Sequence, residues 1–132
     1  MILQLTPNLV ADRIEPSVAF FEKVGFTLDV QVPEDDHIGF AILVNGKNQV
    51  MYQTRQSLAD DDEAFIPAAE SKGPSLLFIT VSDVEAVAAA LDGYEVVMKM
   101  RDTFYGAKEI SFLEPAGHVV TFAEFSEEAK ES

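Results

Sequence analysis

The chain has 132 residues, 48% of them hydrophobic and ten of them Phe, which is enough apolar material for one domain with its own core. The formal net charge is −14 and only nine residues are Lys or Arg. This balance argues against nucleic acid and membranes as partners, because each bound phosphate needs a cationic group. The absence of Cys excludes a disulfide framework, a thiolate metal site and a thiol nucleophile.

The start of the chain is predicted to be a strand, over residues 3–10. It has no basic region followed by an apolar stretch, so it does not resemble a signal peptide. No apolar run in the chain approaches the ~20 residues that a membrane-spanning helix needs. We therefore expect a cytoplasmic protein.

A helix is predicted next. Asp12-Arg13-Ile14-Glu15 has the spacing of a capping box, with Asp12 at the N-cap and a carboxylate three residues later. Pro16 lies in the first turn, where its missing N–H is tolerated, and Gly25 marks the end of the helix. Strands are predicted over residues 26–32, 38–44 and 49–54, the last two joined by a turn that contains Gly46.

Residues 55–74 are predicted to be a linker with a short helix near residues 58–64, ending at Gly73-Pro74. Beyond it the same order of elements returns at an offset of about seventy. A strand over residues 75–81 precedes a second capping box, Ser82-Asp83-Val84-Glu85, with Ser82 at the N-cap and a helix that stops at Gly93. Three further strands are predicted over residues 94–101, 108–113 and 119–124.

The sequence therefore predicts one domain, residues 1–132, built from two βαβββ modules. The first module spans about residues 1–54 and the second about residues 75–125, and the tail, residues 126–132, is acidic and expected to be frayed.

Two segments resemble motifs of a known family. Residues 12–26 (DRIEPSVAFFEKVGF) are similar to its first helix, and residues 105–109 (YGAKE) with residues 114–118 (EPAGH) are similar to its closing hairpin, where Asp-Pro-Asp-Gly is usual. On these motifs the chain resembles the vicinal-oxygen-chelate superfamily, which includes glyoxalases, bleomycin-resistance proteins and extradiol dioxygenases. The resemblance spans nearly the whole chain. It implies an α+β fold in which two tandem βαβββ modules form a cupped mixed sheet, but it implies no single function.

Side chains alternate between the two faces of each predicted strand. One face is uniformly apolar and is expected to pack against the helices: Leu5, Leu9, Val50, Tyr52, Leu77, Ile79, Val81, Val120 and Phe122. The opposite face mixes apolar and polar residues, as a ligand-binding cup does. A partly solvated sheet face would show the same pattern.

The resemblance also allows a test for metal binding. Metal-dependent members carry His or Glu at four inward positions, which the motif register places at Thr6, Met51, Leu76 and Thr121. The offset of seventy links Thr6 to Leu76 and Met51 to Thr121. An alkyl group, a thioether and two neutral hydroxyls are poor ligands for divalent cations. We therefore expect neither metal nor another cofactor.

Three other polar residues are candidate ligands or catalytic groups. His118 is interpreted as a turn residue, and His37 as an exposed residue of a polar loop. Glu109 is expected to point into the cup beside Ser111, as a polar anchor, a base or, less simply, a metal ligand.

Two main functions follow. The first is a metal-free, small-molecule-binding protein, similar to bleomycin-resistance proteins, whose acidity favours a cationic drug-like ligand. The second is a lyase, isomerase or dioxygenase that uses a metal held by other groups, or Glu109 as a base. An interaction module without a ligand is a third possibility. We expect a homodimer, since pairing would cover exposed sheet edges. The residues expected to line the cup are Thr6, Asn8, Phe40, Met51, Gln53, Leu76, Phe78, Phe104, Tyr105, Glu109, Ser111 and Thr121.

Overall fold

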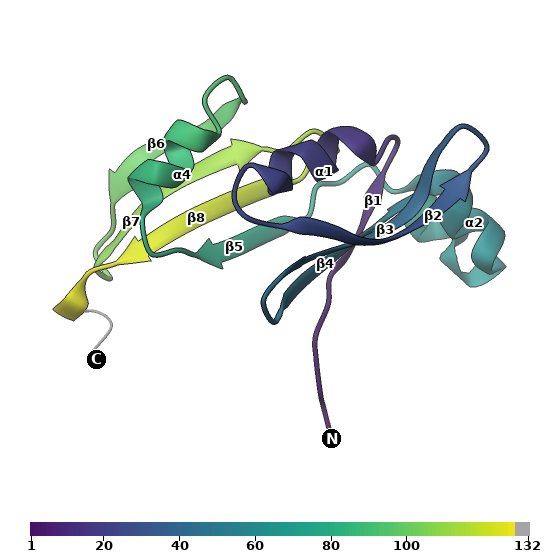
Figure 1. Cartoon of the computed structure of the whole chain (residues 1–132), viewed down its shortest axis with the longest axis horizontal. Coiled ribbons are helices and arrows are strands. Elements are labelled where there is room, and N and C mark those ends of the chain that lie inside the picture. Colours follow the sequence, from purple (N-terminus) through teal and green to yellow (C-terminus); the bar gives the residue numbers. More distant parts are fainter. Residues whose placement is uncertain (129–132) are drawn as a thin grey trace. The chain divides into compact units, whose positions relative to one another are not determined.

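The computed structural model describes residues 1–128, which form two compact units, residues 1–73 and residues 74 onward (Figure 1). Each contains a four-stranded mixed sheet, with strand order β1-β4-β3-β2 in the first and β5-β8-β7-β6 in the second. The elements are β1 (Asn8–Ala11), α1 (Glu15–Glu22), β2 (Thr27–Glu34), β3 (His37–Asn45), β4 (Asn48–Thr54), α2 (Arg55–Asp61), the 3-10 helix η1 (Glu63–Phe65), α3 (Ile66–Glu70), β5 (Leu76–Thr80), α4 (Val84–Ala90), β6 (Val96–Asp102), β7 (Ala107–Leu113) and β8 (Val119–Phe125).

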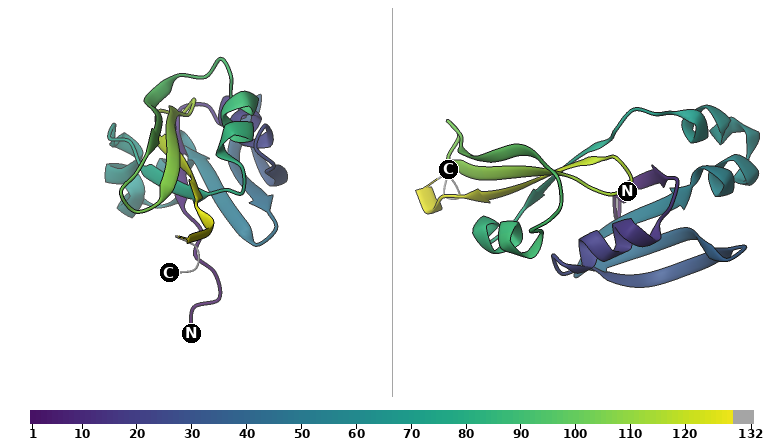
Figure 2. Two further views of the ribbon diagram at one scale, coloured as in Figure 1. Left: turned by 90° about the vertical axis from the view of Figure 1, so that its left-hand side faces the viewer. Right: turned by 90° about the horizontal axis from the view of Figure 1, so that it is seen from above.

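In the first unit, α1 covers one face of the sheet (Figure 2). Leu9, Val50 and Tyr52 are buried on this face, as the alternating pattern predicts. The ring of Phe21, from α1, lies 6.2 Å from the ring of Tyr52 in β4. Alternation then directs the side chains of Asn8 and Met51 to the opposite face.

In the second unit, α4 contacts β7 and β8. Four apolar side chains on the covered face are almost wholly buried: Ile110, Phe112, Val120 and Phe122. Val84 and Leu91, at the two ends of the helix, are fully buried as well. The neighbours of these strand residues along the chain, such as Glu109, Ser111 and Thr121, therefore face away from α4.

The strand register confirms the internal repeat. In the first unit Asn8 pairs with Met51 across β1 and β4, which run parallel. In the second unit Phe78 pairs with Thr121 across β5 and β8, also parallel, seventy positions further along in both strands. The α+β architecture of two four-stranded mixed sheets with helices is the one predicted.

The first strand is shorter than predicted. It begins at Asn8 and not near residue 3, and the chain before it runs away from the sheet (Figure 1). Leu5, which was expected to pack against the helix, is 82% exposed. Pairing starts at the carbonyl of Pro7, which accepts from the N–H of Met51 at 2.9 Å. Pro7 has no N–H of its own with which to continue a ladder.

Neither predicted N-cap is correct. Helix α1 starts at Glu15 behind Ile14, and the Glu15 carboxylate accepts from the N–H of Ile38 at 2.8 Å instead of folding back on its own helix. The N-cap of α4 is Asp83, whose side chain accepts from the N–H of Ala86 at 3.0 Å, and Ser82 lies outside the helix. The two capping boxes therefore predicted both helices correctly, but they predicted the N-cap residue of each helix incorrectly.

Residues 55–74 contain more structure than predicted, because α2, η1 and α3 all lie in them, at one end of the first sheet (Figure 2). The predicted short helix begins earlier, at Arg55, because the Thr54 hydroxyl caps it by accepting from the N–H of Ser57. None of the helices in residues 1–128 has the length and apolar character needed to cross a membrane. Of the acidic tail, residues 129–132 lie outside the described part.

Candidate functional site

The face of the first sheet that turns away from α1 carries four of the predicted cup residues, and the fifth, Thr6, lies in the segment just before β1. The polar ones bond to near neighbours. The Thr6 hydroxyl donates to the side chain of Gln49 (2.8 Å), the Asn8 amide donates to Gln53 (3.0 Å), and Gln53 donates to the hydroxyl of Ser57 (3.1 Å). Among them, Phe40 and Met51 are half-buried. This face therefore combines apolar side chains with polar side chains that are already hydrogen-bonded to their neighbours.

The corresponding face of the second sheet carries Leu76, Phe78, Glu109, Ser111 and Thr121. Leu76 and Phe78 are 76% and 54% exposed. The hydroxyls of Ser111 and Thr121 lie 2.6 Å apart and bond to each other. Glu109 is the most buried of the five, at 1% exposed. Within each unit, then, the predicted residues that lie on strands share one face.

Glu109 is held by two side chains. One carboxylate oxygen accepts from Nη2 of Arg101 at 3.2 Å, and the other accepts from the hydroxyl of Tyr105. A buried carboxylate is costly unless it is paired, and these two donors compensate it. The hydrogen bond to Glu109, with a smaller effect of burial, raises the pKa of Tyr105 above its ordinary value, so the phenol stays protonated as a donor. Both oxygens of the Glu109 carboxylate are therefore already engaged and are not free to bind a cationic group of a ligand.

The loop between β6 and β7 positions Tyr105. Its ends are joined because the N–H of Thr103 donates to the carbonyl of Ala107 at 2.8 Å and the N–H of Ala107 donates to the Thr103 hydroxyl at 3.0 Å. Gly106 has φ +85°, a conformation that glycine adopts without strain, and its carbonyl accepts from the N–H of Ser126. These bonds fix the loop to both neighbouring strands.

Four aromatic rings follow one another from β5 to this loop, and we call them the aromatic row: Phe78, Phe125, Tyr105 and Phe104. Ring centroids are 6.4 Å apart for Phe78 and Phe125, 6.2 Å for Phe125 and Tyr105, and 5.1 Å for Tyr105 and Phe104. Tyr105 is 40% exposed and Phe104 fully exposed. Exposed, adjacent rings form a surface on which a planar organic molecule can stack.

Two further members of this site, Arg101 and Phe125, are not among the residues predicted from the sequence. Both could have been found from the strand pattern. Phe125 continues the alternation of Thr121 and Ala123 by one more step along the same strand. Arg101 lies directly opposite Glu109 in the β6–β7 pairing, which follows once the loop between the strands is placed at residues 103–106.

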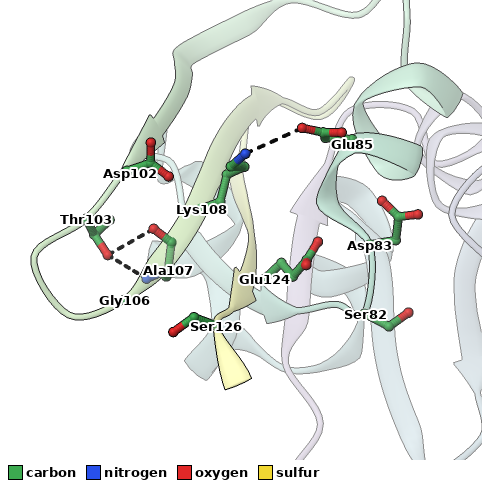
Figure 3. A pocket seen from close by; sticks show the side chains of 10 residues that line it. All are labelled: Ser82, Asp83, Glu85, Asp102, Thr103, Gly106, Ala107, Lys108, Glu124 and Ser126. Carbon is green, nitrogen blue, oxygen red and sulfur yellow. Dashed lines mark hydrogen bonds and ion pairs between the residues drawn. The ribbon is translucent and has the colours of Figure 1, made fainter. Parts of the chain in front are cut away.

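A pocket of about 630 Å³ lies elsewhere in the second unit (Figure 3). Lys108 and Glu124 reach it from the face that α4 covers, and Lys108 pairs with Glu85 at 3.5 Å. Glu124 accepts from the N–H of Val84 at 3.0 Å, which ties β8 to the start of α4. The pocket is therefore separate from the aromatic row. Its lining is mostly acidic and polar: Ser82, Asp83, Glu85, Asp102, Thr103, Gly106, Ala107, Lys108, Glu124 and Ser126.

The two histidines lie at hairpins. His118 is buried, its Nδ1 accepts from the N–H of Ser75 at 2.9 Å, and its own N–H donates to the Glu114 carboxylate. The prediction that His37 is exposed is wrong, because its side chain is only 19% exposed. Its Nε2 lies 2.7 Å from the Glu34 carboxylate and its Nδ1 lies 3.0 Å from the Asp36 carboxylate. These two hydrogen bonds hold the side chain at the start of β3.

The residues present do not fit the metal that some members of the predicted family hold. The side chains at Thr6, Met51, Leu76 and Thr121 include no carboxylate and no imidazole. Glu109, the buried carboxylate on the same face as Thr121, is already paired. Within residues 1–128, no three His, Asp or Glu side chains converge where they could hold a metal ion.

The fold is shared with solved structures of several kinds. TioX from Micromonospora sp. ML1 has a TM-score of 0.75 at 19% identity, covering 95% of this chain and 100% of TioX. TnmS3, an antibiotic binding protein from Streptomyces sp. CB03234, has a TM-score of 0.71 at 18% identity, covering 96% of this chain and 98% of TnmS3. Lactoylglutathione lyase from Agrobacterium tumefaciens has a TM-score of 0.71 at 18% identity, with 94% of both chains covered.

No curated protein matches the sequence of the chain. A family model does match it, over residues 2–122, nearly its whole length. The chain therefore belongs to the glyoxalase/bleomycin resistance protein/dioxygenase superfamily.

Proposed function

We propose that the protein binds a small organic molecule, without a metal, on a sheet face that turns away from the helix of its own unit. The observation that carries the proposal is the chemistry of the four inward positions, which offers two hydroxyls, a thioether and an alkyl group where metal-dependent members carry His or Glu. The apolar surface and the few fixed polar groups on the same faces are typical of ligand sites.

A second observation supports binding over catalysis. TnmS3, which shares the fold, is an antibiotic binding protein. The aromatic row offers rings to a ligand, whereas Glu109, the residue best suited to act as a base, has both oxygens engaged by Arg101 and Tyr105.

The alternative is a lyase, isomerase or dioxygenase. It is favoured by the lactoylglutathione lyase that shares the fold and by the buried carboxylate on the sheet face, which could act as a base if Arg101 and Tyr105 released it. Turnover that is lost on Glu109→Gln, with binding retained, would support this alternative.

We also propose a homodimer. The apolar side chains Ile2, Leu3 and Leu5 before the first strand are 84%, 99% and 82% exposed, and burial of such surface stabilises association. Light scattering at micromolar concentration should give twice the mass of the chain. The mass of a single chain would contradict the proposal.

The test has two parts. Protein produced with added zinc, nickel, manganese and iron should contain less than stoichiometric metal by elemental analysis. Metal-stripped protein is then screened against organic compounds by thermal shift, since a ligand at 100 times its Kd stabilises the native state by about 2.7 kcal/mol. Phe78→Ala should abolish the shift, whereas Phe65→Ala, at a similarly exposed ring on η1, should not. One equivalent of tightly bound metal, or shifts that Phe78→Ala leaves unchanged, would contradict the proposal.

A further inference from the structure

The charge on the face of the second sheet is arranged differently from what the composition suggests. The whole chain is strongly acidic. The carboxylate on this face, Glu109, is nevertheless 1% exposed, while the side chain of its partner Arg101 is 55% exposed. A ligand that approaches this face therefore reaches the guanidinium before it reaches the carboxylate.

Arg101 retains donors for a ligand. A guanidinium carries five N–H groups in a planar fork. Within residues 1–128 the structure contains one hydrogen bond from it, from Nη2 to Glu109 at 3.2 Å. The ion pair with Glu109 holds the group in place, so less conformational freedom is lost when a ligand binds to the remaining N–H groups.

The guanidinium also lies beside the aromatic row. Tyr105 donates to the second oxygen of the same carboxylate that accepts from Arg101, and its ring leads to Phe125 and Phe78. An oxygen atom held by Arg101 would therefore belong to a molecule whose ring system can contact these rings.

We propose that this site takes a planar aromatic compound that carries an oxygen acceptor, above all a carboxylate, and that Arg101 binds the acceptor. The inference rests on the proposed function, since it names the class of ligand for the same face. Carboxylates match the guanidinium fork with two parallel hydrogen bonds.

A cationic compound fits this site less well. To reach Glu109 it would have to displace both Arg101 and Tyr105, and otherwise its charge would lie close to a guanidinium of the same sign. Exposed charges more than about 10 Å away are largely screened at ordinary ionic strength, whereas Arg101 acts at contact distance.

Three probes with one ring system test the inference: naphthalene-2-carboxylate, the neutral naphthalene-2-carboxamide and 2-naphthylmethylammonium. Their affinities for the full chain are measured by calorimetry at physiological ionic strength. The carboxylate should bind on the order of tenfold or more tightly than the ammonium compound, with the amide between them.

Substitutions distinguish the contribution of Arg101 to binding from the contribution of the aromatic rings. Arg101→Gln alone leaves a buried carboxylate without its cation and could unfold the unit, so the informative variant is Arg101→Gln with Glu109→Gln, which removes both charges together. In it the preference for the carboxylate should disappear. Arg101→Lys should keep the preference but weaken it, because an ammonium group lacks the fork. Phe78→Ala should weaken all three probes alike.

Tighter binding of the ammonium probe overturns the inference, and so does a preference that the double variant leaves unchanged. If the ammonium probe binds best and Phe78→Ala abolishes its binding, the inference fails while the proposed function stands. If no probe binds and no compound stabilises the metal-stripped protein in the thermal-shift screen, both fail.

Discussion

Glu109 and Glu114 are both 1% exposed, yet different groups hold them. Glu114 accepts from the backbone N–H of His118, within the hairpin that joins β7 to β8. Glu109 accepts from the side chains of Arg101 and Tyr105. A backbone donor is fixed by the fold, whereas side-chain donors can change rotamer. For this reason we assign Glu114 to the hairpin and Glu109 to the candidate site.

The N-cap of α4 allows a first prediction about a single residue. Asp83→Ala removes the side chain that accepts from the N–H of Ala86, so it should lower the free energy of unfolding by about 1 kcal/mol. Ser82→Ala, one position earlier and outside the helix, should change it by less than about 0.5 kcal/mol. Urea denaturation of both variants measures the difference. Equal losses, or a larger loss for Ser82→Ala, would show that the helix is capped as the sequence predicted.

His37 gives a prediction on pH. The hydrogen bond to Asp36, followed by the one to Glu34, raises the pKa of His37 above its ordinary value of 6.5, and burial, with a smaller effect of Arg13, opposes this. Because the raised pKa belongs to the folded state, the stabilisation is complete below pH 6.5 and is lost as the pH rises through the raised value.

The free energy of unfolding should therefore fall with rising pH above 6.5, and the fall should be smaller in His37→Gln. Urea denaturation at several pH values, in the wild type and this variant, provides the measurement. A pH dependence that is the same in both proteins would mean that other groups cause it.

At the scale of elements, much of the fold could be predicted from the sequence. Alternating apolar residues located the strands, and the repeat at seventy placed them in register, because burial of one sheet face strongly constrains both. The ends of elements could not be predicted as well. Whether Glu15 folds back on its own helix or reaches Ile38 depends on a strand that is distant in the sequence.

The turn that follows α1 allows a prediction about how a helix ends. Gly25 has φ +103°, and a Cβ there would lie 2.9 Å from Nδ2 of Asn45, which donates to the Gly25 carbonyl. Gly25→Ala should therefore lower the free energy of unfolding by about 1–3 kcal/mol. Gly73→Ala is the control, since open space surrounds that position, and it should leave stability unchanged or raise it by less than about 1 kcal/mol. Similar effects of the two substitutions would contradict this account of the turn.

At the scale of the whole molecule, the family could be predicted from the sequence. The placement of the four ligand positions of metal-dependent members at Thr6, Met51, Leu76 and Thr121 remains a prediction. The pairing of Arg101 with Glu109 could not be read in the same way, because it depends on the loop length between β6 and β7 and on the side-chain conformations that burial selects. The sequence-based expectation of a cationic ligand treated Glu109 as open. It remains a prediction, and the probe experiment decides between it and the acceptor-bearing ligand.

The metal dependence of ligand binding tests directly whether the protein binds its ligand without a metal. The compound that most stabilises the protein is titrated by calorimetry into metal-stripped protein and into protein supplied in turn with zinc, nickel, manganese and iron(II). We expect the same affinity in every case and the compound recovered unchanged, because the side chains at Thr6, Met51, Leu76 and Thr121 offer the ion no carboxylate and no imidazole. Binding that appears only with a metal, or conversion of the compound when a metal is present, would contradict the account.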